Sequence, residues 1–248
     1  MSPTWFKLLA TLAASILLMA MPAMSQPVSF KSKDSVKIFA NFEPANGKTR
    51  GIVLLFHMAG SNKGEYAPLA PTLNQAGFAT LAIDQRAGGD RWGETNQTAA
   101  RAGGNAAFAD AIPDLEAALD YAVKRRLGPI VLWGSSYSSA LVFIVAARHP
   151  EVKALLAFSP AEYIEGYSIS KQAAALSIPV YITSAPDQSE VDSARLIASA
   201  VSDKKANLFV PDNGAHGSAT LRVDVNPGGA SENWRKVMMF LDNALPAN

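Results

Sequence analysis

The chain has 248 residues, 49% of them hydrophobic, which is enough for one large α/β domain with a sizeable core. Its 22 basic and 21 acidic side chains nearly balance and form no basic run, which argues against nucleic acid or an anionic membrane surface as a partner. Because cysteine is absent, the sequence excludes disulfides, a lipid-attachment cysteine and a thiolate nucleophile.

The first 25 residues have the pattern of a secretory signal peptide. A lysine precedes an apolar stretch over residues 8–21, and Ala23 and Ser25 place small residues at the −3 and −1 positions of a cleavage site. A membrane anchor is the alternative, but the stretch is shorter than the roughly 20 residues that span a bilayer, and a proline follows it. We expect cleavage near Ser25, a single mature domain over residues 26–248, and a periplasmic or secreted protein.

Strand-like and helix-like segments alternate along the rest of the chain. Residues 51–56 form a near-continuous apolar run, which is typical of a strand buried on both faces, and residues 112–126 carry an apolar stripe at helical spacing. The alternation indicates a mostly parallel central sheet of about eight strands with helices on both faces, and the segment after strand 154–158 is too brief to contain a large cap domain. The expected strands are 28–30, 36–42, 51–56, 78–83, 130–133, 154–158, 179–183 and 207–210, and the expected helices are 68–75, 112–126, 140–148, 191–201 and 231–245.

The segment from Gly134 to Ser138 joins an apolar strand to a helix. It has the small-x-Ser-x-small pattern of a nucleophile elbow, in which a strained turn raises the central serine hydroxyl above the sheet. Strand and helix approach closely there, so the residues two before and two after the serine must be small. We therefore expect Ser136 to be a nucleophile. A Ser- and Gly-rich loop without a catalytic role is the alternative.

Two further reactive groups follow the ends of later strands. Asp187 follows strand 179–183, and His216 follows strand 207–210. Reactive groups belong at the carboxyl ends of parallel strands, and the order serine, acid, histidine is the one expected for a serine hydrolase of this architecture. The imidazole would take the serine proton, and the carboxylate would hold the imidazole in the right tautomer. These positions predict a triad of Ser136, Asp187 and His216.

The oxyanion that forms in such a reaction needs backbone N–H donors. The first donor is expected from Tyr137, the residue after the nucleophile. The second is expected from the turn after strand 51–56, at Met58 or Ala59.

Other residues of the right chemical type have structural interpretations. Glu190 and Asp192 compete with Asp187 for the acid position, but both are expected to begin the next helix, where negative charge is favourable. His57 is expected to shape the turn near the oxyanion donors. His149 is expected to lie at a helix end, where a cation favours the helix dipole.

A polar, glycine-rich loop is expected over residues 87–106. Loops of about 20 residues within a compact domain are usually functional or disordered. This loop leaves the carboxyl end of strand 78–83, so we expect Arg91 and Trp92 to line a substrate pocket and Arg86 to meet a substrate carboxylate. A solvent-exposed flap with no specific role is the alternative.

The whole mature chain resembles the α/β-hydrolase fold, in particular small cap-less members similar to dienelactone hydrolases and prolyl-oligopeptidase-type catalytic domains. The resemblance implies hydrolysis of a small-molecule carboxylic ester or lactone through an acyl-enzyme, with no metal or organic cofactor. A peptidase or amidase acting on small peptides, or a binding protein on the same scaffold, remains the alternative. The motifs that carry the resemblance are His57-x-x-Gly60, Gly134-x-Ser136-Tyr137-Ser138, Asp187 and Gly214-Ala215-His216-Gly217.

The sequence departs from the pattern of that family in three places. Dienelactone hydrolases typically carry a cysteine nucleophile, and this chain has none. Met58 follows His57 where glycine is usual, and Ser138 replaces the second glycine of the elbow. None of these departures removes a catalytic group.

Overall fold

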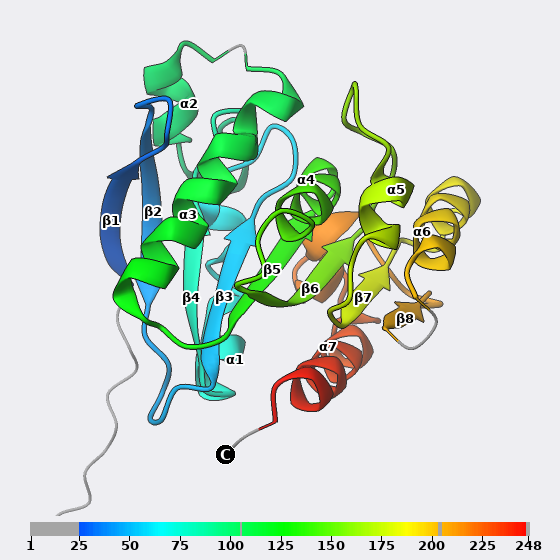
Figure 1. Ribbon diagram of the computed structural model, residues 1–248. Coiled ribbons are helices and arrows are strands. Elements are labelled where there is room, and N and C mark those ends of the chain that lie inside the picture. Colours follow the sequence, from blue (N-terminus) through cyan, green and yellow to red (C-terminus); the bar gives the residue numbers. More distant parts are fainter. Residues whose placement is uncertain (1–24, 105, 203–204, 247–248) are drawn as a thin grey trace, which may run out of the picture.

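In the computed structural model, helices lie on both faces of one central sheet (Figure 1). The structure describes residues 25–104, 106–202 and 205–246, so the expected signal segment lies outside it apart from Ser25. The eight-stranded sheet has the order β1-β2-β4-β3-β5-β6-β7-β8. Its strands are β1 (Gln26–Lys31), β2 (Lys37–Glu43), β3 (Gly51–Phe56), β4 (Phe78–Ile83), β5 (Ile130–Ser135), β6 (Val152–Phe158), β7 (Val180–Thr183) and β8 (Ala206–Phe209).

The strand directions confirm the mostly parallel sheet. β1 pairs antiparallel with β2, and β2 pairs antiparallel with β4. All pairings from β4 through β3, β5, β6 and β7 to β8 are parallel. The carboxyl ends of these six strands therefore meet at one edge of the sheet, where loops from distant parts of the sequence come together.

Helices cover the sheet on both faces, as expected. α3, α4, α5 and α6 pack on one face, and α1 and α7 pack on the other. Among the described residues, no helix has the length and apolar character needed to cross a membrane. The helices are α1 (Ala70–Gln75), α2 (Gln97–Ala102), α3 (Ile112–Arg125), α4 (Tyr137–Ala146), α5 (Ile169–Ala174), α6 (Gln188–Ala200) and α7 (Ala230–Ala244), with 3₁₀ turns η1 (Lys63–Tyr66), η2 (Arg91–Gly93), η3 (Phe108–Ala111) and η4 (Gly217–Leu221).

The centre of the molecule is the pair β5–α4. Every residue of β5 and of α4 is buried, which explains why both segments are mainly apolar rather than amphipathic. Within β5, the Trp133 ring stacks on Phe158 of β6 with 4.5 Å between centroids. Burial of each large apolar side chain contributes about 1.5–3 kcal/mol, so the turn between β5 and α4 is anchored by a buried strand and a buried helix.

The segment expected to be a loop over residues 87–106 contains secondary structure instead. It holds the turn η2 and the helix α2, whose first turn is capped by Asn96 through a 2.8 Å hydrogen bond from the Ala99 N–H. The Asn62 side-chain amide donates to the carbonyl oxygens of Gly89 and Glu94 at 3.1 and 2.7 Å. These bonds tie the segment to the turn after β3, so it is an ordered part of the fold rather than a loop without secondary structure.

Candidate active site

The turn between β5 and α4 has the strained geometry expected of the nucleophile elbow. Ser136 adopts φ 56° and ψ −124°, a conformation that non-glycine residues rarely accept. A side chain at Gly134 would place its Cβ 2.3 Å from the Ser138 carbonyl oxygen, so only glycine fits where strand and helix converge. The Ser136 side chain therefore stands at the N-terminus of α4, at the carboxyl edge of the sheet.

The structure brings the side chains of Ser136 and His216 together across 80 residues of sequence. His216 Nε2 lies 2.8 Å from the Ser136 Oγ. Its Nδ1 lies 2.8 Å from Oε1 of Glu190. With its proton on Nδ1, the imidazole donates to the carboxylate and leaves Nε2 free to accept the serine hydroxyl proton.

The carboxylate beside His216 belongs to Glu190 and not to Asp187, which corrects the expected triad. Helix α6 begins at Gln188, three residues earlier than the sequence indicated, and Asp187 is its N-cap. The Asp187 carboxylate accepts from the Ser189 N–H and hydroxyl at 3.0 and 2.6 Å, and no contact between Asp187 and His216 occurs among the described residues. Asp192 is also turned away, since it accepts a hydrogen bond from Gln188.

Electrostatics keep the Glu190 carboxylate ionised. Burial alone would raise its pKa, but hydrogen bonds from His216, Ser159 and the Ala185 N–H together hold the pKa below its ordinary value. A negative carboxylate at this place would stabilise an imidazolium at His216.

Ser159 connects the histidine loop to the sheet. It follows β6 with φ 55°, and its Oγ accepts a hydrogen bond of 2.9 Å from the Gly217 N–H. The next N–H, that of Ser218, donates to the Ser135 Oγ at 2.9 Å. The backbone on the C-terminal side of His216 is thus fixed to the ends of β5 and β6. No periodic pattern in the sequence indicates either contact.

The Glu65 carboxylate occupies one of the backbone N–H groups that were expected to bind an oxyanion. Its fully buried side chain accepts the Met58 N–H at 2.9 Å and the Ser61 hydroxyl at 3.0 Å, so Met58 is not a free donor. No acceptor occupies the Ala59 N–H among the described residues. Tyr137 is the first residue of α4, where helical N–H groups lack partners within the helix. Of the expected donors, Tyr137 and Ala59 remain available.

Ser138, one of the departures from the family pattern, makes specific contacts. Its hydroxyl donates to the His57 carbonyl oxygen at 2.6 Å and accepts from the Gln85 side-chain amide at 2.7 Å. The same amide donates to the Tyr137 hydroxyl at 2.9 Å. A glycine here could not join the elbow to the turn that carries Ala59, so the replacement is a structural link between the two halves of the site.

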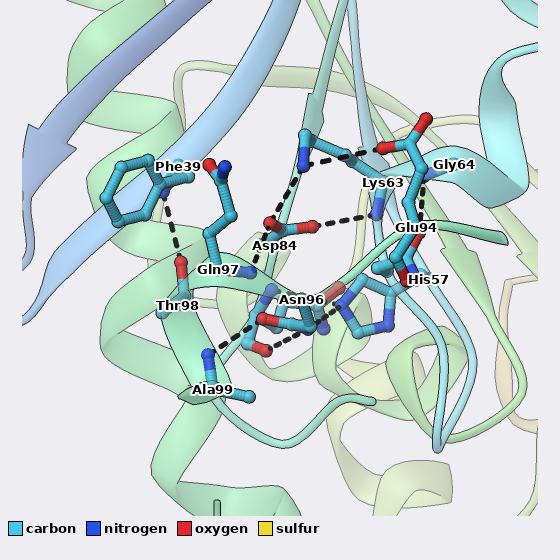
Figure 2. Close-up of polar contacts among 12 residues, drawn as sticks. Phe39, His57, Lys63, Gly64, Asp84, Glu94, Asn96, Gln97, Thr98 and Ala99 are labelled. Atoms are coloured by element: carbon cyan, nitrogen blue, oxygen red, sulfur yellow. Dashed lines mark hydrogen bonds and ion pairs between the residues drawn. The ribbon is translucent and has the colours of Figure 1, made fainter. Parts of the chain in front are cut away.

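His57 has the structural role expected of it. Its ring is fully buried, Nδ1 donates to the Met58 carbonyl oxygen at 2.8 Å, and Nε2 accepts from the Gln85 N–H at 3.0 Å. Figure 2 shows the Asn96 side chain against this ring and, nearby, the Asp84 carboxylate bound to Lys63 and the Gln97 N–H. Burial lowers the pKa of His57 to about 4, so the ring is neutral at pH 7.

Arg86 does not face a substrate site. Its guanidinium is largely buried between two carboxylates, with Nη2 2.6 Å from Asp114 and 2.9 Å from Asp34. The hydrogen bonds that Arg86 donates to the carboxylates of Asp34 and Asp114 raise its pKa, although burial opposes this. The arginine therefore joins the β1–β2 turn to α3, and the expectation that it meets a substrate carboxylate is wrong.

Trp92 lies in η2 rather than in the lining of a described cavity. The Arg222 guanidinium lies over its ring at 3.8 Å from the centroid, and Arg91 lies at 5.5 Å. Arg91 also approaches the Met58 sulfur at 3.4 Å. Trp92 thus packs with the loops around the histidine and oxyanion turns, and the structure gives it no contact with Ser136. Among the described residues, no group of three or more His, Asp or Glu side chains could hold a metal ion.

Comparison with known proteins adds the family and the fold. The family described as "Serine aminopeptidase, S33" matches residues 47–218. No curated protein matches the sequence. Among solved structures, the chain is similar to an esterase from Pyrococcus furiosus, with 17% identity over 89% of this chain and 93% of that one and a TM-score of 0.71.

Two further solved structures share this architecture. A dienelactone hydrolase from Anabaena variabilis is 18% identical over 91% of this chain and all of that one, with a TM-score of 0.72. An acylaminoacyl peptidase from Pyrococcus horikoshii is 12% identical over 93% of this chain but 43% of that one, with a TM-score of 0.69. These likenesses confirm the α/β-hydrolase fold that the sequence motifs indicated.

Proposed function

Because the chain belongs to the serine aminopeptidase, S33 family and is therefore a serine hydrolase, we propose that it cleaves a carboxylic ester through a triad of Ser136, His216 and Glu190. The observation that carries this proposal is the continuous chain of 2.8 Å contacts from the Ser136 hydroxyl through His216 to Glu190. A solvated ester carbonyl can approach Ser136 from the carboxyl edge of the sheet, where no cap domain intervenes in the described chain.

In the proposed acylation, the Ser136 Oγ attacks the ester carbonyl carbon while His216 Nε2 takes the hydroxyl proton. The C=O bond becomes a single bond to an oxyanion, which the Tyr137 and Ala59 N–H groups stabilise by roughly 3–4 kcal/mol per donor. The ester C–O bond then breaks, and His216 gives its proton to the departing alcohol. The acyl group remains on Ser136.

Deacylation repeats these roles with water as the nucleophile. His216 takes a proton from water as the water oxygen attacks the acyl carbon. Collapse of the second tetrahedral intermediate returns the proton to Ser136 and releases the carboxylic acid. Glu190 stays ionised throughout and stabilises the imidazolium in each step.

A change of Ser136 to alanine tests the proposal. The variant should lose turnover of p-nitrophenyl acetate by roughly 10⁴-fold or more because the acyl acceptor is gone, while its unfolding curve stays close to that of the wild type. Ser199→Ala, at an exposed position on α6, is the matched control and should keep full activity. Undiminished turnover by the Ser136 variant would show that another group carries the reaction.

A peptidase acting on small peptides is the second candidate. The family description and the acylaminoacyl peptidase neighbour both favour it, and the same triad would serve an amide. Aminoacyl p-nitroanilides assayed beside p-nitrophenyl esters of the same acyl group separate the two. We expect the ratio of kcat/KM for the ester to kcat/KM for the anilide to exceed the ratio of their uncatalysed hydrolysis rates in water. A smaller ratio of kcat/KM would favour the peptidase.

We also propose that the protein is exported. Support comes from the signal-like pattern of residues 1–25, which ends directly before β1 at Gln26. The intact mass of protein recovered from the periplasm or medium of the expressing cells should correspond to a chain that begins near Gln26. Recovery of the full-length chain in the cytosol would contradict export.

A further inference from the structure

A cavity of about 530 Å³ opens between two segments at the carboxyl edge of the sheet. One segment precedes α3 and the other precedes α5, and both rise above the sheet beyond the N-terminal end of α4 (Figure 1). Ligand pockets commonly enclose about 300–1,000 Å³, so this space suits part of a small molecule. The cavity is lined by Ala106, Ala107, Phe108, Ala109, Tyr163, Glu165 and Gly166.

The cavity adjoins the nucleophile on both of its walls. On one wall, the Phe108 ring stacks on Tyr137, the residue after Ser136, with 4.3 Å between centroids. On the other wall, the Tyr163 hydroxyl donates to the Ser159 carbonyl oxygen at 3.2 Å. Burial and the charge of Glu190 raise the pKa of Tyr163, while the nearby Ser136 hydroxyl lowers it, so this phenol lies close to the triad.

The lining of the cavity is mainly apolar and contains one charged residue. Three alanines and two aromatic rings give it an apolar surface, and Phe108 is 37% exposed. Exposure of a large aromatic side chain beside a catalytic serine is typical of a ligand-binding surface. Glu165 is the one charged residue of the lining, and no hydrogen-bond or ion-pair partner for it occurs among the described residues.

We propose that this cavity binds an apolar group of the ester substrate and that Glu165 makes it select a neutral or cationic group over an anionic one. The inference rests on the proposed ester hydrolysis. It adds a substrate class: esters with an apolar chain or ring of several carbons, uncharged or carrying an ammonium group at the far end. A carboxylate at that end would face the Glu165 charge without a partner and would be disfavoured.

Narrowing the cavity tests the apolar part of the proposal. Ala107→Trp places a large ring in the space, and Phe108→Ala removes the wall that stacks on Tyr137. kcat/KM is measured for p-nitrophenyl esters from acetate to octanoate and for acetate esters of methanol to octanol. In both variants, kcat/KM should fall at least about tenfold for the long members of one series and little for acetyl or methyl esters. Burial of two to three methylenes contributes a free energy that corresponds to this factor.

Leu208→Ala is the matched control for the Phe108 variant, since Leu208 is an apolar side chain of β8 that is 38% exposed. It should leave both series unchanged. If the cavity variants change neither series, or change short and long esters by the same factor, the cavity is not a substrate site. Acetate turnover that stays dependent on Ser136 in those variants keeps this failure separate from a failure of the proposed hydrolysis.

Charge selection is tested with three acyl groups of similar length on p-nitrophenol: hexanoate, 6-aminohexanoate and monoadipate. The wild type should hydrolyse the anionic ester least efficiently, and Glu165→Gln should raise its kcat/KM relative to the cationic ester by about two- to fivefold, the range expected for an exposed charge pair. Glu151→Gln, an exposed glutamate outside the cavity, should leave the ratio unchanged. A ratio that is the same in Glu165→Gln and wild type would overturn the role of Glu165.

Discussion

At the scale of single residues, His57 shows how the fold fixes a protonation state. The ring has protein partners on both nitrogens and no contact with solvent, and burial lowers its pKa to about 4. In the unfolded chain the pKa returns to about 6.5. Between pH 6.5 and pH 4, His57 is protonated in the unfolded state and neutral in the folded state. The contribution of His57 to stability is therefore present above pH 6.5 and is lost as pH falls toward 4.

The free energy of unfolding should therefore decrease between pH 6.5 and pH 4 with a slope that approaches about 1.4 kcal/mol per pH unit from this group alone. Urea unfolding at a series of pH values measures the slope. His57→Gln should flatten this slope, because the variant lacks the buried imidazole. Proton NMR of the wild type gives an independent check. An imidazole resonance of His57 that titrates near pH 6.5 would contradict the account.

At the scale of elements, the start of α6 determines which carboxylate reaches His216. The Asp187 carboxylate accepts hydrogen bonds from the Ser189 N–H and hydroxyl, as expected of an N-cap residue. Glu190 lies in the first turn, with a longer side chain that reaches both the Ala185 N–H and the imidazole. The residue at which α6 begins therefore determines which carboxylate caps the helix and which one contacts His216.

Replacement of these two carboxylates should separate the roles. Glu190→Gln should reduce kcat by roughly 10²- to 10⁴-fold, because an amide can neither hold the reactive tautomer of His216 nor stabilise the imidazolium. Asp187→Ala should leave kcat near the wild-type value and lower the melting temperature slightly through loss of the cap. Steady-state kinetics and thermal unfolding of both variants measure this. Equal loss of kcat in the two would mean that Glu190 is not the acid.

The boundaries of elements mark how far the sequence could predict the site. Periodic patterns located the eight strands and the helices α1, α3, α4, α6 and α7 to within a few residues, because apolar spacing reports which face of an element is buried. They missed the six-residue helices α2 and α5, which are too short to show a period. The same spacing cannot resolve a shift of three residues at the start of α6, and the sequence has three acidic side chains between residues 187 and 192. The prediction of Asp187 failed for that reason.

Contacts between side chains that are distant in the sequence could not be predicted for a different reason. Ser138 and His57 are 81 residues apart, and neither belongs to a pattern that reports the other. Arg86 follows a strand end as a ligand-binding residue would, but two carboxylates from other segments enclose it. Which polar groups pair depends on the packing of whole elements, and no local rule encodes that packing.

At the scale of the whole molecule, the site exists because three strands end at the same edge. The residues after β5 and β8 supply the serine and the histidine, and the helix after β7 supplies the carboxylate. β6 lies between β5 and β7 and contributes Ser159, which fixes the histidine loop. The order of strands in the sheet, rather than any one motif, places the hydroxyl beside the imidazole.

The hydrogen-bond chain from Glu190 through His216 should make Ser136 far more reactive than any other serine in the protein. Incubation of the purified protein with a fluorophosphonate, followed by peptide mass spectrometry, measures that reactivity directly. We predict one stoichiometric adduct on Ser136, which forms much more slowly in His216→Ala. An unmodified Ser136 in folded protein, or labelling at the same rate without His216, would contradict the central claim.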